Sequence, residues 1–245
     1  MKKSLQFDAH ARIAICSDVH LDDEPSDLTH HFQEELTQIS QDVDAIILLG
    51  DIFHYWLGDK CVQRYAQTME RLKKISERCN VYFMPGNRDF LLDTRVLSKF
   101  NVVLLNDPCV MVHGDKRIFL THGDQYCSLD TAYLRLRYVI QHPFTKVLAR
   151  IVPYAWRFCI AEYLRAKSRL HTPSKSQTTM DIYFPSLEQA MLSHNSSLVI
   201  YGHVHYLRDC VLEHRTKSRC ITLDSWQHQT NFCFITEKTI ELITR

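Results

Sequence analysis

The segment Ala45–Asp51 constrains the fold most, because five apolar residues there run into Gly50 and then into a carboxylate. A short apolar run that ends at a glycine is typical of a strand buried on both faces, and this run is too short for a helix. Asp51 then stands at the carboxyl end of a central strand, where ligands bind in open α/β sheets. The segment therefore predicts an α/β fold with a functional site beside Asp51.

Four other apolar runs end in the same kind of side chain. They begin at Ile13, Val81, Ile118 and Leu198, and each leads into an Asp, Asn or His, usually beside a glycine. A single polar residue at a strand end is more often a turn cap than part of a site. Five strands that end in this way, and that are expected to end at one edge, predict a shared site. The candidate ligands are Asp18, His20, Asp51, Asn87, His122, His203 and His205. Carboxylate, amide and imidazole donors without a thiolate favour Mn²⁺, Fe or Zn²⁺ over Mg²⁺ or Ca²⁺.

The order of the periodic segments indicates two sheets. Apolar residues at helical spacing predict helices over Leu28–Ile39, with Asp27 as the N-cap, and over Val62–Ile75. With the strands around them they form a βαβαβ pattern, which implies parallel strands. Further strands are predicted at Val102–Leu105, Cys109–Val112, Arg117–Thr121, Leu198–Tyr201, Leu207–Leu212, Arg219–Leu223, Phe232–Ile235 and Thr239–Leu242, the last four as an antiparallel set. We expect two sheets packed face to face, with helices outside.

Composition narrows the class of protein. A chain of 245 residues is long enough for one large α/β domain with an insertion. Its nine cysteines form no C-x-x-C pair, which favours a reducing compartment over a disulfide framework or a thiolate zinc site. The N-terminus lacks the apolar stretch of a signal peptide, and no run approaches the ~20 apolar residues that span a bilayer. We expect a cytoplasmic monomer, free or surface-bound, and the net charge of +1 predicts no nucleic-acid partner.

The segment 129–175 differs from the remainder of the chain. Within it, Leu134–Lys175 carries nine Lys or Arg against one acid, a local charge of +8. The segment lacks strand signals and is predicted to form helices broken at Pro143 and Pro153. Nine of the eleven residues in Tyr154–Leu164 are apolar, so this helix must be covered on more than one side. It either packs between the core and a neighbouring helix, or turns one side to lipid, a membrane surface or another subunit.

In order and spacing, the motifs resemble those of the calcineurin-like metallophosphoesterases. They stand here as Asp18-Val-His20, Gly50-Asp51, Gly86-Asn-Arg-Asp89, His122 and Gly202-His-Val-His205. The resemblance implies two packed mixed β-sheets flanked by helices, an αββα sandwich, here with a helical insertion. It also implies a pair of metal ions bridged by Asp51 that clamp a phosphoryl group. One ion would take Asp18, His20, Asp51 and His205, and the other Asp51, Asn87, His122 and His203.

Arg88 narrows the reaction, because most of this superfamily has a histidine at that position. A histidine can protonate an alkoxide leaving group, whereas an arginine, with a pKa above ~12, cannot. An arginine can instead bind a phosphate through two parallel hydrogen bonds. We infer a leaving group that needs no proton, such as a phosphate monoester released from a pyrophosphate. A protein phosphatase activity is disfavoured on the same ground.

A closer resemblance, to the UDP-2,3-diacylglucosamine hydrolases, covers most of the chain. It rests on Gly50-Asp-Ile-Phe-His-Tyr-Trp-Leu-Gly-Asp59, Gly86-Asn-Arg-Asp-Phe-Leu-Leu92, Thr121-His-Gly-Asp-Gln-Tyr-Cys127 with Asp130 and Tyr133, and Arg165-Ala-Lys-Ser168 with Ser174-Lys175-Ser176 and Met180-Asp181. That family hydrolyses the pyrophosphate bond of UDP-2,3-diacylglucosamine to 2,3-diacylglucosamine 1-phosphate (lipid X) and UMP in lipid A biosynthesis. The resemblance implies a water activated by two Mn²⁺, or by other divalent metals, and a peripheral protein on the cytoplasmic face of the inner membrane.

The same resemblance assigns roles to individual residues and segments. The catalytic residues would be Asp51, Asn87, Arg88 and His122. The substrate contacts would be Asn87, Arg88, Asp130, Ser168, Thr172, Lys175 and His203. Residues 129–175 would form a helical lid, with basic residues for phosphates and apolar faces for two acyl chains and the bilayer surface. Residues 1–128 and 176–245 would form the metallophosphoesterase core.

Some of these roles have a simpler alternative. Asp130 fits equally as the N-cap of a helix that begins there, and Ser168 and Thr172 fit as caps at a helix end. The chain departs from the family at Thr172-Pro173, Tyr206-Leu207 and Asp224-Ser225, which bears on sugar and acyl-chain selectivity and leaves all seven ligands intact. Two other functions stay open: another nucleotide-diphosphate metallohydrolase with the same core, and a non-catalytic binding module on the same fold.

Overall fold

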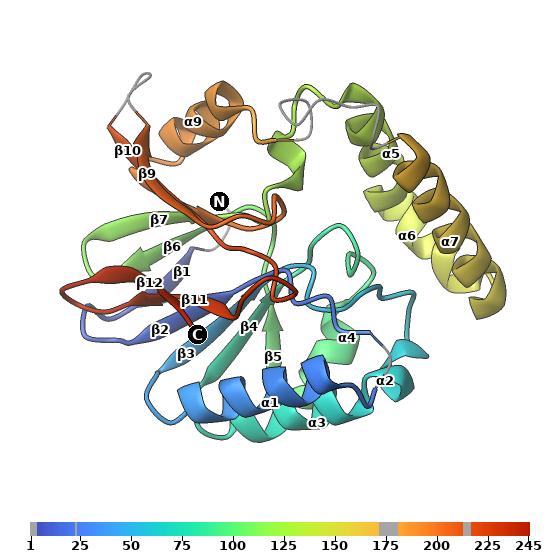
Figure 1. Cartoon of the computed structure of the whole chain (residues 1–245), viewed down its shortest axis with the longest axis horizontal. Coiled ribbons are helices and arrows are strands. Elements are labelled where there is room, and N and C mark those ends of the chain that lie inside the picture. The colour runs from blue at the N-terminus through green and yellow to red at the C-terminus, as the bar shows by residue number, and fades with distance from the viewer. Residues whose placement is uncertain (1–3, 23, 172–180, 213–216) are drawn as a thin grey trace.

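The computed structural model describes residues 4–22, 24–171, 181–212 and 217–245, and for residues 167–171 it describes the backbone alone. Within this part of the chain, twelve strands form two six-stranded sheets. The sheets face one another, with α1 (Asp27–Ile39) and α3 (Ala66–Ser76) under one and α9 (Phe184–Ser193) over the other (Figure 1). The predicted αββα sandwich is therefore confirmed.

The first sheet has the order β12-β11-β2-β3-β4-β5 and is parallel from β2 to β5. Its strands are β2 (Ile13–Cys16), β3 (Ala45–Leu49), β4 (Asn80–Met84), β5 (Val102–Leu104), β11 (Asn231–Ile235) and β12 (Ile240–Thr244). All five residues of β3 are buried, as predicted for the central strand. Because β2 pairs with β3 from Ile13 opposite Ala45, both strands end at the same edge.

The second sheet has the order β1-β6-β7-β8-β10-β9. Its strands are β1 (Leu5–Phe7), β6 (Cys109–His113), β7 (Lys116–Leu120), β8 (Leu198–Tyr201), β9 (Arg208–Leu212) and β10 (Ser218–Thr222). β6 and β7 form the predicted hairpin, and β8 pairs in parallel with β7. His122 and His203, which follow β7 and β8, therefore leave the sheet at one edge.

Side chains that alternate along the central strands build the core in layers. Ile47 belongs to the layer between the two sheets, which also contains Ile118. Its neighbour Ile46 belongs to the layer under α1 and α3, together with Phe32. A third layer lies under α9 and includes Leu187. Burial on both faces explains why the central strands are continuous apolar runs in the sequence.

The predicted N-cap of α1 is wrong by one residue. Ser26 is the N-cap, and its Oγ accepts a hydrogen bond from the Thr29 N–H over 3.2 Å. Asp27 is the first helical residue. Serine and aspartate are equally good N-caps, so residue type does not choose between neighbours.

The single helix predicted over Val62–Ile75 is also wrong, because α2 (Cys61–Arg64) and α3 are separated at Tyr65. Tyr65 has φ −112° and ψ 33°, outside the helical region. Its side chain is fully buried, with the ring centroid 4.5 Å from that of Phe53 and Oη donating to Tyr55 O over 3.2 Å. The break lets this ring enter the core.

The predicted antiparallel set at the C-terminal end is divided between the sheets. β9 pairs with β10 and β11 pairs with β12 in antiparallel fashion, but β10 also pairs in parallel with β8. β11 pairs with β2 and so extends the first sheet. Strand β1 was not predicted, because it has only three residues and none is fully buried.

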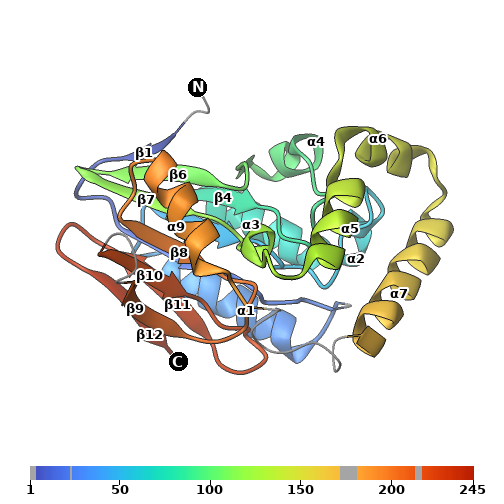
Figure 2. The same ribbon diagram turned by 90° about the horizontal axis from the view of Figure 1, so that it is seen from above.

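Three helices stand beside the sheets rather than over their faces (Figures 1 and 2). They are α5 (Thr131–Gln141), α6 (Pro143–Ile151) and α7 (Tyr154–His171), so the predicted breaks at Pro143 and Pro153 are confirmed. In α7, Tyr154 and Ala161 pack against the core, whereas Trp156 is 68% exposed. No helix among the described residues combines the length and the apolar character needed to cross a membrane.

Candidate metal centre

The carboxyl ends of five strands bring the predicted ligands to one place. Asp18 and His20 follow β2 of the first sheet, and Asp51 and Asn87 follow its strands β3 and β4. The remaining ligands come from the second sheet, where His122 follows β7 and both His203 and His205 follow β8. Contacts between the loops join the two sheets there. The His203 N–H donates to Asp18 Oδ2 over 2.8 Å, and His122 Nδ1 lies 3.1 Å from Leu49 O. The predicted convergence of the strand ends is therefore present in the structure.

The backbone of this region adopts an unusual conformation. Seven non-glycine residues of the described chain have a positive φ, and five of them are candidate ligands: Asp18, His20, Asp51, His203 and His205, with φ from 53° to 72°. Side chains larger than glycine rarely adopt this region, and such residues collect at functional sites where the surrounding structure enforces them. The conformation turns each side chain out of its strand direction and toward the shared centre.

Asp18, His20 and His205 form a first group of facing donor atoms. His20 Nε2 lies 3.1 Å from His205 Nε2, and Asp18 Oδ1 lies 3.3 Å from His205 Nε2. Such a group could hold a metal ion. Asp18 Oδ1 is buried and accepts no hydrogen bond from the described residues, which is unfavourable unless a cation meets it.

Asp51, Asn87 and His122 form a second group beside the first. His122 Nε2 lies 3.1 Å from Asn87 Oδ1 and 3.7 Å from Asp51 Oδ2. A hydrogen bond from Nδ1 to Leu49 O selects the tautomer that leaves Nε2 free as a ligand. The ring of His203 lies 5.2 Å from that of His122, between centroids. Asp18 and Asp51 lie within reach of His122, so the two groups adjoin.

Gly86 and Gly202 are needed because ligand carboxylates lie in close contact with their backbone. A Cβ at Gly86 would overlap the carboxylate of Asp51. A Cβ at Gly202 would overlap Ser17 Oγ and the carboxylate of Asp18. Glycine is the default residue where a functional group approaches the backbone this closely. The Gly-Asn and Gly-His pairs of the motifs thus make room for the carboxylates.

The charges of the site call for cations. Burial, assisted by the charge of Arg88, lowers the pKa of His20 to about 2, and burial lowers the pKa of His203 to about 4. These imidazoles are neutral and keep a lone pair. Burial also opposes charge on His122, but Asp51 and Asp18 outweigh it and raise the pKa of His122 to about 9. The raised pKa of His122 shows that the carboxylates stabilise a positive charge at this place. The donor set fits divalent metal ions, which would displace the extra proton of His122 when they bind.

Arg88 lies beside the carboxylate of Asp51, which adjoins both groups of donor atoms. The side-chain Nε of Arg88 is 3.4 Å from Asp51 Oδ2, and the backbone N–H of Arg88 donates a hydrogen bond to Asp51 Oδ1 over 2.8 Å. The Arg88 side chain is 31% exposed, while Asp51 is 2% exposed. The guanidinium can therefore contact a bound anion from the solvent side of the centre.

Of the remaining predicted substrate contacts outside the metal centre, the structure describes the side chain of Asp130 alone. Asp130 is the N-cap of α5, where its Oδ1 accepts a hydrogen bond from the Tyr133 N–H over 3.1 Å. The simpler alternative for Asp130 is therefore confirmed as a structural role. Thr172 and Lys175 lie outside the described residues, and so does the side chain of Ser168, whose backbone belongs to α7.

Sequence reasoning missed three carboxylates that support the ligands: Asp89 and Asp124, which are buried, and Asp107, which is 9% exposed. Asp89 accepts hydrogen bonds from the N–H groups of Gly86 over 2.6 Å and Ile52 over 3.0 Å, which joins the two ligand loops. Asp107 accepts from the His122 N–H over 3.2 Å. The third, Asp124, binds Arg137 of α5. Asp89 and Asp124 stand within the recognised motifs and could have been found, whereas Asp107 stands in a loop without a motif.

Comparisons with known proteins identify relatives of this chain. The family model described as calcineurin-like phosphoesterase matches residues 11–207. A protein of Shewanella loihica named UDP-2,3-diacylglucosamine hydrolase is 32% identical over 92% of this chain and 93% of its own. A protein of the same name from Coxiella burnetii is 33% identical over 86% of this chain and 88% of its own. A solved archaeal phosphodiesterase is 15% identical, with a TM-score of 0.48 over 96% of this chain and 99% of its own. The family match and the two relatives show that this chain belongs to the calcineurin-like phosphoesterases and, among them, to the proteins named UDP-2,3-diacylglucosamine hydrolase.

Proposed function

We propose that the protein hydrolyses the pyrophosphate bond of UDP-2,3-diacylglucosamine to 2,3-diacylglucosamine 1-phosphate and UMP. The observation that carries this proposal is the convergence of seven donor side chains from two sheets beside Arg88. The names of the relatives supply the substrate. The chemistry of the site agrees, because a leaving phosphate needs no proton and Arg88 has none to give.

The roles of the donor residues follow from their contacts. Asp18, His20 and His205 would hold one ion and Asn87, His122 and His203 the other, with Asp51 shared between them. When bound, divalent ions polarise a phosphoryl oxygen and make water a stronger nucleophile at neutral pH. We propose Mn²⁺ as the working metal. Oxygen and imidazole donors without a thiolate suit Mn²⁺, Fe or Zn²⁺, and the resemblance to the UDP-2,3-diacylglucosamine hydrolases implies Mn²⁺ among these.

The remaining residues would position the substrate and stabilise charge. Arg88 would bind the phosphates through its guanidinium and stabilise the negative charge that develops on them. The bond from His122 Nδ1 to Leu49 O would keep that imidazole oriented during turnover. Lys175 and His203 are proposed as further phosphate contacts, and Ser168 and Thr172 as further contacts with the substrate.

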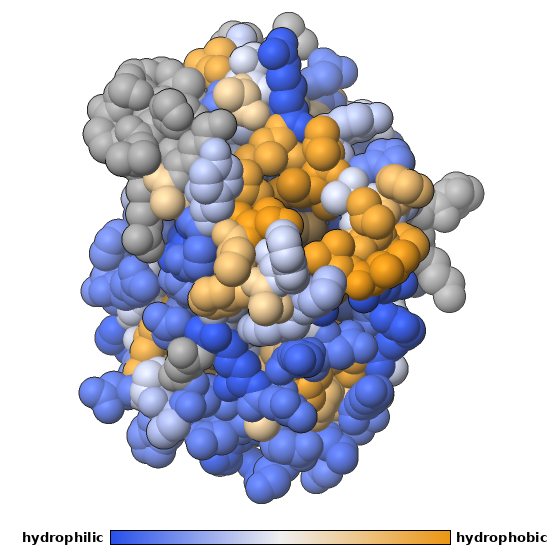
Figure 3. Space-filling model, turned by 90° about the vertical axis from the view of Figure 1, so that its right-hand side faces the viewer, coloured by the Kyte–Doolittle hydropathy of each residue, from blue (hydrophilic) through white to orange (hydrophobic). Residues whose placement is uncertain are grey.

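We further propose that residues 129–175 act as a lid over a core made of residues 1–128 and 176–245. The lid carries an apolar patch, defined as the exposed apolar side chains of α5–α7: Leu136, Tyr138, Val139, Phe144, Val147, Leu148, Ile151, Trp156, Phe158, Ile160 and Tyr163. Figure 3, which shows the side of the molecule formed by α5–α7, has a hydrophobic area on this face, with hydrophilic surface below it. An exposed apolar patch of this size marks a binding surface. Because the proposed substrate is a lipid that resides in a membrane, we propose the bilayer surface as the partner.

The cytoplasmic face of the inner membrane is the proposed location. All nine cysteines are free, which agrees with a reducing compartment. Replacing Trp156 and Ile160 by serine should weaken binding to vesicles, since these side chains are 68% and 51% exposed on the patch. The matched control is Val211→Ser on β9, where the valine is 55% exposed away from α5–α7. Unchanged vesicle binding of the double variant would contradict the membrane assignment.

The reaction is tested by Mn²⁺-dependent release of UMP from UDP-2,3-diacylglucosamine in detergent. UDP-N-acetylglucosamine, which lacks the acyl chains, is the comparison substrate, and Asn87→Ala is the inactive control. Cleavage of the lipid substrate alone, lost in the variant, is the expected result. Equal cleavage of both substrates would point to a general nucleotide-diphosphate hydrolase. No cleavage of either would favour a different pyrophosphate or a binding module.

A further inference from the structure

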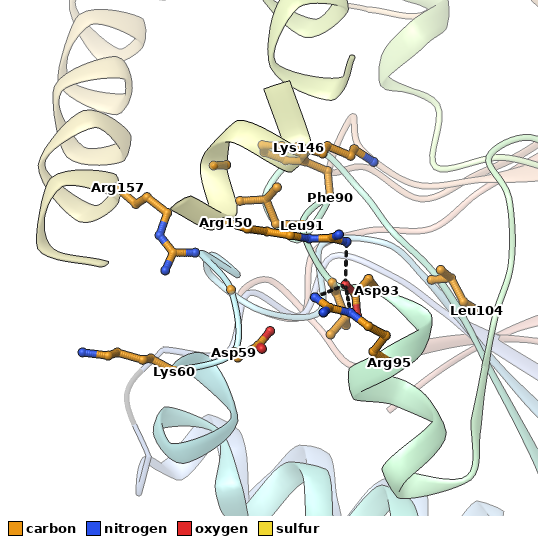
Figure 4. Close-up of a pocket in the computed structure, with 13 residues that line it drawn as sticks. Asp59, Lys60, Phe90, Leu91, Asp93, Arg95, Leu104, Lys146, Arg150 and Arg157 are labelled. Carbon is orange, nitrogen blue, oxygen red and sulfur yellow. Dashed lines mark hydrogen bonds and ion pairs between the residues drawn. The ribbon is translucent and has the colours of Figure 1, made fainter. Parts of the chain in front are cut away.

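Two cysteines face one another on neighbouring strands of the second sheet. In the antiparallel pair of β9 and β10, Cys210 lies directly opposite Cys220. Figure 1 shows these two strands beside α9 at one edge of the sheet. Neither cysteine lines the pocket between the lid and the core, whose walls include α6, α7 and the loop after β4 with α4 (Thr94–Leu97) (Figure 4). The function proposed above makes no use of this pair.

No other cysteine on a described strand has a cysteine as its cross-strand partner. The partners of the others are apolar: Leu48 for Cys16, Leu120 for Cys109, and Ile15 and Leu242 for Cys233. Directly opposed residues of an antiparallel pair have Cα atoms about 4.5 or 5.5 Å apart. Disulfides join Cα atoms that are about 4.4–6.8 Å apart. A bond between the sulfurs of Cys210 and Cys220 therefore requires rotation of the side chains and no movement of the strands.

The two thiols differ in their access to solvent. Cys220 is fully buried in the layer under α9, whereas Cys210 is half-buried against the same layer. Burial, together with the neighbouring Cys210 and Glu188, raises the pKa of Cys220 to about 12. Strand β9 is the last strand in its sheet, so one side of it has no partner strand among the described residues. Cys210 is therefore the thiol that a reagent in solution meets first.

We propose that Cys210 and Cys220 form a reversible disulfide by exchange with a low-molecular-weight disulfide such as glutathione disulfide. In the first step, Cys210 loses its proton to solvent, and its sulfur attacks the reagent to form a mixed disulfide and release one thiolate. In the second step, Cys220 loses its proton and attacks the sulfur of Cys210, which releases the second thiolate. The two released thiolates take up the two protons. Two protein thiols are thereby oxidised, and one small disulfide is reduced to two thiols.

The disulfide would fix an edge strand that begins close to the metal centre. Strand β9 begins at Arg208, three positions after the candidate ligand His205, and within the described chain it pairs with β10 alone. Strand β10 ends at Thr222, four positions before Trp226, whose N–H donates to Asp18 O over 3.2 Å. A link between the two strands therefore restrains two loops that approach the ligands. Transient disulfides of this kind are typical of redox sensing in reducing compartments.

The test is incubation of the whole native protein with glutathione disulfide. The remaining thiols are then alkylated, and the peptides are mapped by mass spectrometry without reductant. The expected product is a pair of peptides joined through Cys210 and Cys220, with the loss of two hydrogen atoms from the protein. Excess reduced glutathione should restore both thiols. The oxidised protein should exchange the amide hydrogens of β9 more slowly than the reduced protein, with unchanged exchange in β3. This result does not depend on the proposed reaction.

Single substitutions separate the two steps of the exchange. Cys220→Ala should retain glutathione on Cys210, because the thiol that resolves the mixed disulfide is absent. Cys210→Ala should leave Cys220 unmodified, because Cys220 is buried. The matched control is Cys109→Ala on β6, where the cysteine is half-buried opposite Leu120, and it should form the disulfide as the wild type does. Cys159 on α7 is exposed and should keep its glutathione in every variant.

Three results with the wild-type protein would overturn the proposal. Glutathione that persists on Cys210 would show that Cys220 does not attack the mixed disulfide. A disulfide to a second chain, seen as a dimer on a gel without reductant, would show that the two thiols of one chain do not react with each other first. An unmodified Cys210 in a protein whose Cys159 has reacted would show that the edge of the sheet excludes the reagent. Each result is read from the wild type, so none depends on the folding of a variant.

Discussion

Arg137 Nε donates a hydrogen bond to Asp124 Oδ2 over 2.7 Å, and this contact ties α5 to the loop that carries His122. Tyr133 Oη donates to the same oxygen over 2.6 Å. The Tyr133 ring also stacks with the imidazole of His203, with 6.2 Å between centroids. The first helix of the proposed lid is thereby joined to two candidate ligands. Movement of this helix and order in the metal centre should therefore be coupled.

Arg137→Gln should destabilise the protein strongly. Asp124 is fully buried, and the substitution would remove its counter-charge, which typically costs about 3–5 kcal/mol of unfolding free energy. Urea denaturation of the metal-free protein measures the loss. The matched control is Arg219→Gln, because the Arg219 and Asp209 side chains are 37% and 38% exposed and such a pair is worth about 0–1 kcal/mol. Equal losses in the two variants would show that burial does not set the strength of the Arg137–Asp124 pair.

Removal of metal should lower stability as well as activity. Asp18 and Asp51 are 0% and 2% exposed and adjoin one another, so their charges are poorly compensated without cations. Free Mn²⁺ at about 100 times its dissociation constant should add about 2.7 kcal/mol to the free energy of unfolding for each ion bound. Denaturant midpoints in Mn²⁺ and in a chelator measure the difference. Asp51→Asn should lose most of this gain, and an undiminished gain in that variant would place the stabilising metal elsewhere.

Gly86→Ala should weaken metal binding while the fold is retained. An added Cβ would overlap the Asp51 carboxylate, which must then move from its place between the two groups. Displacements of this kind around a metal ligand typically lower affinity by about 10–100-fold. Calorimetric titration with Mn²⁺ provides the measurement. The control is Gly114→Ala. Gly114 lies in the turn between β6 and β7, and a Cβ there would contact Ala9, which is not a candidate ligand. A similar loss of affinity in both variants would contradict the steric explanation.

The strand ends could be predicted because they depend on local sequence. A strand buried on both faces must be apolar throughout, and a polar residue that follows it must leave at the sheet edge. For this reason Asp51 and His122 were identified correctly as meeting at one place, although 71 positions separate them in the chain. The positive φ of Asp51 could not be predicted, since Asp occurs mostly with negative φ and the surrounding loops impose the conformation.

Features that depend on tertiary contacts were missed. The break at Tyr65 arises because its ring packs with Phe53 in the core, which helical periodicity does not reveal. The pairing of Arg137 with Asp107, at 3.6 Å, joins two segments that carry no shared motif. Both cases follow from side chains that meet only after the sheets and helices have packed. Local patterns locate the elements and the ligands, and packing decides what supports them.

Gly58→Ala should loosen α7 from the core. Gly58 has φ +116°, a conformation that is strained for alanine, and its Cβ would overlap the Arg157 guanidinium, which donates to Leu57 O. Such strain typically costs about 1–3 kcal/mol. Faster amide hydrogen exchange in α7, with unchanged exchange in β3, is the expected result.

A double-mutant cycle with Arg157→Ala separates the two causes of this effect. If the guanidinium is the obstacle, Gly58→Ala should destabilise the Arg157→Ala background less than the wild-type background. The backbone strain at Gly58 would remain in both. An identical effect in the two backgrounds would assign the whole loss to the positive φ of Gly58 and none of it to displacement of the Arg157 guanidinium.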